Sequence, residues 1–533
     1  MHIWKTILAH LRKSSASYSY ALVVVSAILI SLSLMYVNYT IAWFALSFLF
    51  LSFFNITQSK QALYKGFVFG VVSAGILNYW MVAAIYQYAQ SSIVLGIICW
   101  LLAATIIGSI YALQFFIYSR VKFSDSAVLH AWGNAFLFAS VWVIVEWLRA
   151  VLFAGMPWMS YSIGITQASH LFLAQPAAVG GVYILSFLVV LVNFTLSYAF
   201  HKKAWRLALI PALIVSAHFI AGSLLYNYSS QQVVAQSKPK VSVALILASM
   251  SPETVWNEQN GNALIQNLLT LNRQAAAVNS DLILWSETVI PWTYSNEDDF
   301  LKEVAKTTAD NNTHFLLGMS TSIAEASNAV YNSAYLFTPT GAVLDRYDKG
   351  ELLSLVESPL FSNSGNIILP FLAGSGLIVQ QGQRQQAMKT PWGKAGVLLC
   401  NESAVPALLN RYPTDQISFL INLGNDGWFS DSFITRQHFY NSRLRAIESR
   451  KDLVINNNRG ISGVIRANGE IGAQYQSDQS SVQQVDVFPN QVAALNYHYF
   501  IYAIFLATAL LLLISFYNKS LIFSLFQTRV LRS

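Results

Sequence analysis

The sequence predicts a polytopic α-helical membrane domain of about eight spans joined to an extramembrane α/β domain. Composition is the first observation: of 533 residues, 55% are hydrophobic and 11% charged, whereas soluble domains carry about 25% charged residues. Secondly, the apolar residues gather in long runs. Thirdly, the segment 229–498 instead alternates short strand-like and amphipathic helical stretches. An ordinary soluble enzyme and a disordered chain are both excluded.

The apolar runs fix the expected spans. A helix needs about 20 apolar residues to cross about 30 Å of hydrocarbon. The first two runs are near the lower limit, so they form either two spans or a short hairpin. We expect a membrane domain over 1–228, an α/β domain over 229–498, and a last helix with its tail over 499–533. The runs are about 21–37, 40–56, 66–86, 92–118, 127–153, 178–200, 207–226 and 499–517.

Basic residues predict the orientation of these spans. They lie at the N-terminus and in alternate loops, at 60–65, 120–122 and 202–206. Loops with an excess of Lys and Arg stay in the cytoplasm. For a bacterial inner-membrane protein, this predicts cytoplasmic N- and C-termini and a periplasmic segment 229–498. The loops between them, 37–40, 87–91 and 154–177, have no Lys or Arg.

The net charge of +7 is not a sign of nucleic-acid binding. Residues 1–228 hold 11 Lys and Arg against Asp125 and Glu146, and residues 229–498 carry a net charge of −5. The basic excess therefore belongs to the membrane segments. Two cysteines exclude a disulfide-rich scaffold, and with no phosphate-binding Gly loop or His/Cys cluster we expect no cofactor and no metal.

The segment 229–498 alternates buried-strand runs with helical patterns, which predicts α/β layers around buried sheets. Helices are expected at 261–278, 297–309 and about 434–450. Strands are expected at 242–247, 281–285, HFLLGMS, AVYNSAYLF, KAGVLLC, ISFLINL, 452–456, 461–466 and 482–488.

Cys400 is the first candidate site residue. It ends the apolar strand GVLLCNE, and α/β folds place their sites at such strand ends. Taken alone, a lone Cys is as often a small buried apolar residue. Cys99, the other cysteine, lies inside an apolar run, so a disulfide with Cys400 is not expected.

Glu287 and Lys349 are the second and third candidates. Glu287 follows the apolar strand in DLILWSETVIP, and Lys349 lies in DRYDKGELL. Each alone is more simply a solvent-exposed charge, but the three together supply the groups that acyl transfer through a thioester needs. A carboxylate takes the proton of the thiol, the thiolate attacks, and an ammonium stabilises the oxyanion.

The order Glu, Lys, Cys on strand ends resembles the nitrilase superfamily, and the flanking membrane runs resemble its apolipoprotein N-acyltransferase family. The resemblance covers nearly the whole chain. It implies an αββα sandwich for the α/β domain. It rests on LILWSETVIPW, DRYDKGELL, GVLLCNE, GNDGWFSDS, QHFYNSRLRAIESRKDLV, NNNRGISGVI and, in the membrane half, VEWLRAVLFAGMPW.

The resemblance implies a role for each matching residue. Glu287 would be the general base, Lys349 the oxyanion stabiliser and Cys400 the nucleophile. The supporting residues would be Glu357, Glu402 and, on a loop at the site, Trp256. The chain departs from the family at Asn401, where an aromatic residue is usual, and at ELLSLVESPLF after Lys349, where a Pro-Phe-Gly-Glu stretch is typical.

Further residues fit a lipid substrate. The apolar stretch 366–374 is either a core strand or a lid that dips into the bilayer surface. Glu146 and Arg149, near the outer end of the fifth run, either pair with each other or hold a lipid head group. His438 and Trp428 are expected to be structural.

The resemblance implies a ping-pong acyltransferase. It would move an acyl chain from a phospholipid, through a thioester on Cys400, to the α-amine of the diacylglyceryl-cysteine of an apolipoprotein. We expect a monomer surrounded by membrane lipids. Two alternatives stay open at this point: a membrane-tethered nitrilase-like amidase, and a catalytically silent scaffold that binds lipids or lipoproteins.

Overall fold

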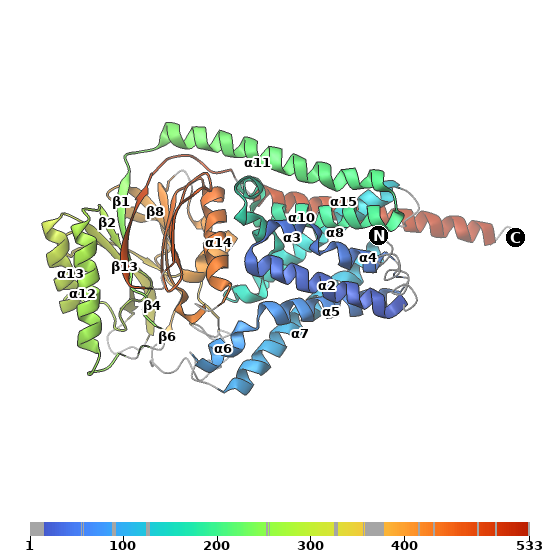
Figure 1. Cartoon of the computed structure of the whole chain (residues 1–533). Coiled ribbons are helices and arrows are strands. Elements are labelled where there is room, and N and C mark those ends of the chain that lie inside the picture. Colours follow the sequence, from blue (N-terminus) through green and yellow to red (C-terminus); the bar gives the residue numbers. More distant parts are fainter. Residues whose placement is uncertain are drawn as a thin grey trace, which may run out of the picture.

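The chain folds into a helical bundle and an α/β domain that face each other (Figure 1). α11 lies along the outside of the bundle and reaches the α/β domain, while the C-terminal end of α15 projects from the opposite end. The computed structural model describes residues 15–54, 56, 58–87, 92–123, 128–251, 254, 256–323, 329–354, 357, 378–413, 416–429, 432–476, 479–495 and 498–530.

The bundle contains helices that match the predicted apolar runs. Three short helices that lie between α8 and α10 in the chain cover the end of the bundle that faces the α/β domain. They are η1 (Pro157–Met159), η2 (Ile163–Ser169) and α9 (Leu171–Ala174). The bundle helices are α2 (Ser15–Tyr36), α3 (Tyr39–Ala45), α4 (Ser47–Phe53), α5 (Ser59–Leu77), α6 (Trp80–Gln87), α7 (Ile93–Val121), α8 (Val128–Leu152), α10 (Ala177–Lys202), α11 (Leu209–Gln236) and α15 (His498–Val530).

Among the described residues, six helices are long and apolar enough to cross a membrane, or seven if the bent pair α5 and α6 is one span. The predicted number of about eight spans is therefore reached only if the segment Tyr39–Phe53 is counted as well. That segment is shorter than a membrane-spanning helix. That segment packs along α2, as the hairpin alternative predicts. α4 lies at the end of the bundle away from the α/β domain (Figure 1).

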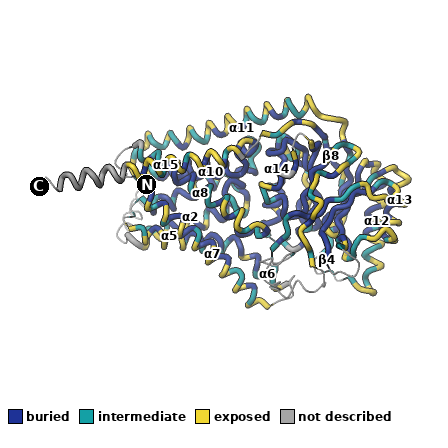
Figure 2. Tube along the Cα trace, turned by 180° about the vertical axis from the view of Figure 1, so that it is seen from behind, coloured by how far each residue is buried: buried dark blue, intermediate teal, exposed yellow. Residues whose placement is uncertain are grey.

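Lipid-facing positions are recognisable on the bundle surface. α7 and α11 expose large apolar side chains such as Leu102, Leu113, Leu213 and Leu224, and Figure 2 shows exposed residues along both helices. In water such a surface would be unfavourable, whereas in lipid it carries no penalty. α11 continues to Gln236, so the helix passes the predicted boundary at residue 228.

The α/β domain has two sheets. The first sheet has the strand order β13-β1-β2-β3-β4-β5, with β6 beside β4, and the second has the order β12-β11-β10-β9-β8-β7. Parallel pairs join β1 to β2 to β3, and β8 to β9 to β10. The strands are β1 (Val241–Leu247), β2 (Leu282–Leu284), β3 (His314–Ser322), β4 (Ala329–Phe337), β5 (Val343–Asp348), β6 (Ile378–Val379), β7 (Met388–Thr390), β8 (Gly393–Leu399), β9 (Phe419–Asn425), β10 (Leu453–Asn458), β11 (Ile461–Ile465), β12 (Ile471–Gln476) and β13 (Ser481–Val487).

The two sheets pack face to face between helices, which confirms the predicted αββα sandwich. One apolar core fills the space between the sheets, and a second joins the first sheet to α12 (Gly261–Ala277) and α13 (Asp299–Asp310). α14 (Ile434–Ser449) covers the second sheet.

α14 also packs against the bundle. Its residues Ile434, Leu444 and Ile447 belong to the apolar core of the membrane domain, and Arg443 donates to the carbonyl of Ala168 at 2.8 Å. The sandwich is thereby fixed against η2, and the strand ends of both sheets are held close to the bundle.

Candidate active site

Glu287 lies just beyond β2, as predicted, and is 6% exposed. Its Oε1 accepts from the Lys349 ammonium at 3.0 Å and from Asn332 Nδ2 at 2.8 Å. Oε2 has no hydrogen-bond partner among the described residues, so one carboxylate oxygen remains available for a proton.

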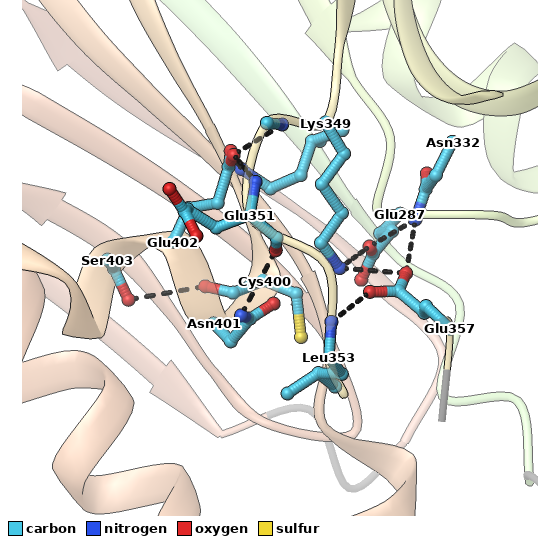
Figure 3. Close-up of polar contacts among 12 residues, drawn as sticks. Glu287, Asn332, Lys349, Glu351, Leu353, Glu357, Cys400, Asn401, Glu402 and Ser403 are labelled. Atoms are coloured by element: carbon cyan, nitrogen blue, oxygen red, sulfur yellow. Dashed lines mark hydrogen bonds and ion pairs between the residues drawn. The ribbon is translucent and has the colours of Figure 1, made fainter. Parts of the chain in front are cut away.

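Lys349 follows β5 and is 1% exposed. Its Nζ forms ion pairs with Glu287 and Glu357, each at 3.0 Å (Figure 3). Burial lowers the pKa of Lys349, but the two carboxylates outweigh burial and hold this pKa well above its ordinary value. The side chain is therefore a permanent buried cation, which suits the stabilisation of an oxyanion.

Asn332, in β4, was not singled out by the sequence and belongs to the same cluster. Its Nδ2 donates to Glu287 at 2.8 Å and to Glu357 at 3.0 Å, and its backbone carbonyl accepts from the Lys349 N–H. Asn332 thus joins the two carboxylates and keeps both facing one ammonium. The sequence pattern of the strand AVYNSAYLF does not distinguish this residue from its neighbours. Its place in the site depends on the register of β4 against β5, which one sequence does not reveal.

Cys400 lies at the junction of β8 and the turn η5 (Cys400–Ala404). Its φ of 50° is in the left-handed region, which costs about 1–2 kcal/mol for a residue with a Cβ. Burial raises the pKa of the thiol well above its ordinary value, Glu287 and Asp426 raise it further, and Lys349 opposes them. The thiol is therefore protonated near neutral pH and needs a base.

Glu402 connects the turn of Cys400 to the loop of Lys349. It is fully buried and accepts from the backbone N–H groups of Leu399, Gly350 and Glu351 at 2.7–3.0 Å. Tyr347 Oη donates to it at 3.0 Å. Burial raises the pKa of Glu402 to about 7, although the backbone donors act to lower it. Its geometry is that of a structural clamp.

A cavity of about 820 Å³, its open mouth included, lies between the two domains and reaches Cys400. The α/β domain contributes Cys400, Asn401 and His438 to its wall, and the bundle contributes Trp80 and Tyr161. Trp80 contacts Phe429 across the domain boundary, with ring centroids 5.1 Å apart. The thiol thus opens onto a mostly apolar space made by both domains.

Glu146 and Arg149 are buried behind this wall. Glu146 accepts from Trp142 and from the Ile163 N–H at 2.9 Å, and Arg149 donates to the Tyr161 carbonyl at 3.0 Å. No ion pair joins the two in the described part of the chain. Both hold the 161–163 loop, and neither lines the cavity at Cys400.

Two other residues singled out in the sequence, Trp256 and Asn401, are placed by the structure. Trp256 packs on Trp292 at 5.7 Å beside α13 and does not line the described cavity. Asn401, the departure from the family pattern, donates to the Glu351 carbonyl at 3.2 Å and faces the cavity. The stretch 366–374 and the Trp428 side chain lie outside the described residues.

Within the described ranges, no three His, Cys, Asp or Glu side chains are placed to hold one metal ion. The grouping of a carboxylate, an ammonium and a thiol is able to perform acyl transfer without one. The carboxylate moves protons, the ammonium stabilises charge, and the thiol carries the acyl group.

Comparisons with known proteins agree with this reading of the fold. Residues 243–497 match the carbon-nitrogen hydrolase family, and residues 26–195 match the apolipoprotein N-acyltransferase N-terminal domain. Together with the sandwich and its Glu–Lys–Cys grouping, the first match defines a membrane-embedded enzyme of the nitrilase superfamily. The second match and the curated relatives narrow this further: the chain belongs to the apolipoprotein N-acyltransferase family.

The relatives match over most of their length. An apolipoprotein N-acyltransferase of Geobacter metallireducens is 27% identical over 85% of this chain and 86% of its own. One from Haemophilus ducreyi is 27% identical over 78% and 80%. Among solved structures, Saccharomyces cerevisiae Nit3, a member of branch 10 of the nitrilase superfamily, matches 48% of this chain and 92% of its own, with 16% identity and a TM-score of 0.37.

Proposed function

We propose that this enzyme transfers an acyl chain from a phospholipid to the α-amine of the N-terminal diacylglyceryl-cysteine of apolipoproteins. The observation that carries the proposal is the position of Cys400. The thiol lies beside the buried Glu287–Lys349–Glu357 cluster (Figure 3) and opens onto a cavity walled partly by the membrane domain. A soluble amide would need no membrane wall, so this feature favours lipid substrates over the amidase alternative.

In the first half-reaction, Glu287 takes the thiol proton as Cys400 Sγ attacks the ester carbonyl carbon of the phospholipid. Lys349 stabilises the oxyanion that forms. The carbon–oxygen bond then breaks, and Glu287 returns the proton to the leaving oxygen of the lysophospholipid. The product is an acyl-thioester on Cys400.

In the second half-reaction, the acceptor amine attacks the thioester carbonyl, again with Lys349 opposite the developing oxyanion. The carbon–sulfur bond breaks, an amide forms, and Cys400 recovers a proton. Asn332 and Glu357 hold Lys349 and Glu287 in place, and Glu402 fixes the loop of Lys349 relative to the thiol. Trp256 is proposed to support the site from its loop, and Glu146 and Arg149 to act on a bound lipid through the 161–163 loop.

A direct test is mass spectrometry of the purified protein with phospholipid. We expect a mass increase of one fatty-acyl group on the peptide that contains Cys400, removed when a diacylated lipopeptide is added and recovered as the N-acyl lipopeptide. A short soluble amide should not be cleaved. If such an amide is turned over and no acyl adduct forms, the amidase alternative is favoured. If neither reaction occurs, the alternative of a catalytically silent scaffold is favoured.

We further propose that the α/β domain lies in the periplasm of a bacterium and that both termini are cytoplasmic. The alternate basic loops support this orientation. It is also supported by α4 and the end of α15 lying away from the α/β domain (Figure 1). The enzyme is proposed to work as a monomer.

The orientation predicts the behaviour of reporter fusions. A reporter active only in the periplasm should be active when fused after residue 330 and silent after residue 533. A reporter active only in the cytoplasm should give the reverse pattern, and a fusion after Lys203 serves as a cytoplasmic control. The opposite result would contradict both the orientation and the access of Cys400 to periplasmic lipoproteins.

A further inference from the structure

The cavity contains a second acid–base pair that the mechanism above leaves unused. His438, on α14, lies with its Nδ1 2.7 Å from Asp426 Oδ1. Asp426 begins η7 (Asp426–Phe429), directly after β9, and is fully buried, whereas His438 is 8% exposed. Because a carboxylate only accepts, Nδ1 carries a proton, so Nε2 of the neutral ring has a free lone pair.

His438 lines the same cavity as Cys400. The charged groups near its ring are Asp426 after β9, Glu287 after β2 and Lys349 after β5. The described bundle wall of the cavity brings no charged side chain toward it. Burial lowers the pKa of His438, but Asp426 and Glu287 outweigh burial and raise this pKa above its ordinary value. An imidazolium formed here is therefore stabilised by Asp426.

We propose that His438, oriented by Asp426, is a catalytic residue of the second half-reaction that binds the acceptor ammonium and takes its proton. The inference rests on the proposed function and adds to it. An α-amine has a pKa of about 8, so the acceptor arrives mainly as an ammonium. With His438 neutral, the Asp426–His438 pair carries one negative charge and presents an acceptor, Nε2, to that cation.

The protons balance as follows. Nε2 takes one proton from the ammonium, and the amine lone pair attacks the thioester carbonyl. A second proton passes from nitrogen to Glu287 and then to Cys400 Sγ as the carbon–sulfur bond breaks. The amide leaves with a free thiol behind, and the imidazolium releases its proton to water at the mouth of the cavity. No ammonium has to lose a proton in the first half-reaction, so that step does not need His438.

The test separates the two half-reactions in His438→Gln, which has a similar size but no basic nitrogen. The full-length protein is acylated with phospholipid, and the acyl-enzyme is then chased with a diacylated lipopeptide. We expect acylation of Cys400 at the wild-type rate and transfer to the lipopeptide slower by about 10²–10⁴-fold, the usual contribution of a general base. Hydroxylamine, a small nucleophile that is uncharged at neutral pH, should cleave the thioester in both proteins.

The pH dependence gives a readout that a merely structural role would not move. Protonated His438 cannot take a proton from the acceptor ammonium, so below the pKa of His438 the wild-type enzyme loses this advantage. The rate of transfer to the lipopeptide in the wild type, divided by the rate in His438→Gln, should therefore fall toward one as the pH drops below that pKa. Asp426→Asn removes the charge that raises this pKa, so the same fall should occur at lower pH. Equal loss of both half-reactions in His438→Gln, an unchanged transfer rate, or a pH-independent ratio would each overturn the inference. Absence of any acyl-enzyme in the wild type would instead reject the proposed function.

Discussion

Cys400→Ala should abolish acyl-enzyme formation and reduce overall transfer by about 10³-fold or more, the order found when a catalytic nucleophile is removed. Cys400 supplies the only thiol among the described residues that line the cavity. Ala keeps the Cβ, so it meets the same left-handed backbone at φ 50° and should leave the fold and its thermal stability nearly unchanged. Mass spectrometry and a lipopeptide transfer assay measure the two quantities.

Two further variants sharpen this experiment. Cys400→Ser conserves size and hydrogen bonding but offers a hydroxyl, which is far less readily ionised than a thiol, so it should also be inactive. Cys99→Ala changes the other cysteine, which lies in α7, and should keep wild-type activity. Substantial turnover in Cys400→Ala would exclude a thioester mechanism, whatever the behaviour of the other two.

Glu287→Gln should slow acylation of Cys400 by about 10²–10⁴-fold near neutral pH, because general-base catalysis contributes this much. The environment raises the pKa of the thiol well above its ordinary value, so a base must remove the proton during attack. Gln keeps the shape of the side chain and an oxygen that accepts from Asn332 and Lys349. The loss therefore reports the missing base and not a collapsed cluster.

The pH profile of this variant distinguishes a base from a simple charge effect. Without Glu287, acylation should rise about tenfold per pH unit as the thiol itself ionises. Lys349→Ala should show no such rescue, since the oxyanion still lacks its cation. Glu357→Gln is the matched control, because it removes the other carboxylate on Lys349 and leaves Glu287 in place. If Glu287→Gln acylates at the wild-type rate near neutral pH, Glu287 is not the base.

The sequence predicted the parts of the fold that depend on local pattern. Apolar runs and strand–helix alternation identified the bundle and the main strands, because burial imposes those periodicities directly. Four strands were not predicted: β5, β6, β7 and β12. β6 is only two residues long. β7 is only three residues long, and β5 and β12 are partly exposed, so none of them shows a continuous apolar run. α11 passes its predicted end because its last turns are polar yet still helical.

The residues of the candidate site that lie at the ends of strands could be predicted from the sequence. Glu287, Lys349 and Cys400 come from three strands, and the structure brings the ammonium to both Glu287 and Glu357. Asn332 could not be found from one sequence, because its role comes from the register of β4 against β5. His438 was expected to be structural. Only the folded chain shows its ring beside Asp426 and open to the cavity of Cys400.

The cavity built jointly by the bundle and the sandwich has a consequence for how rates must be expressed. Both proposed substrates are anchored in the membrane by their acyl chains, so the quantity that governs their encounter with Cys400 is their mole fraction in the membrane or micelle surface. Adding inert detergent at constant bulk substrate should slow turnover, and adding more mixed micelles of fixed composition should not. A saturation constant for this enzyme is therefore a two-dimensional density, and values in molar units from different detergents are not comparable.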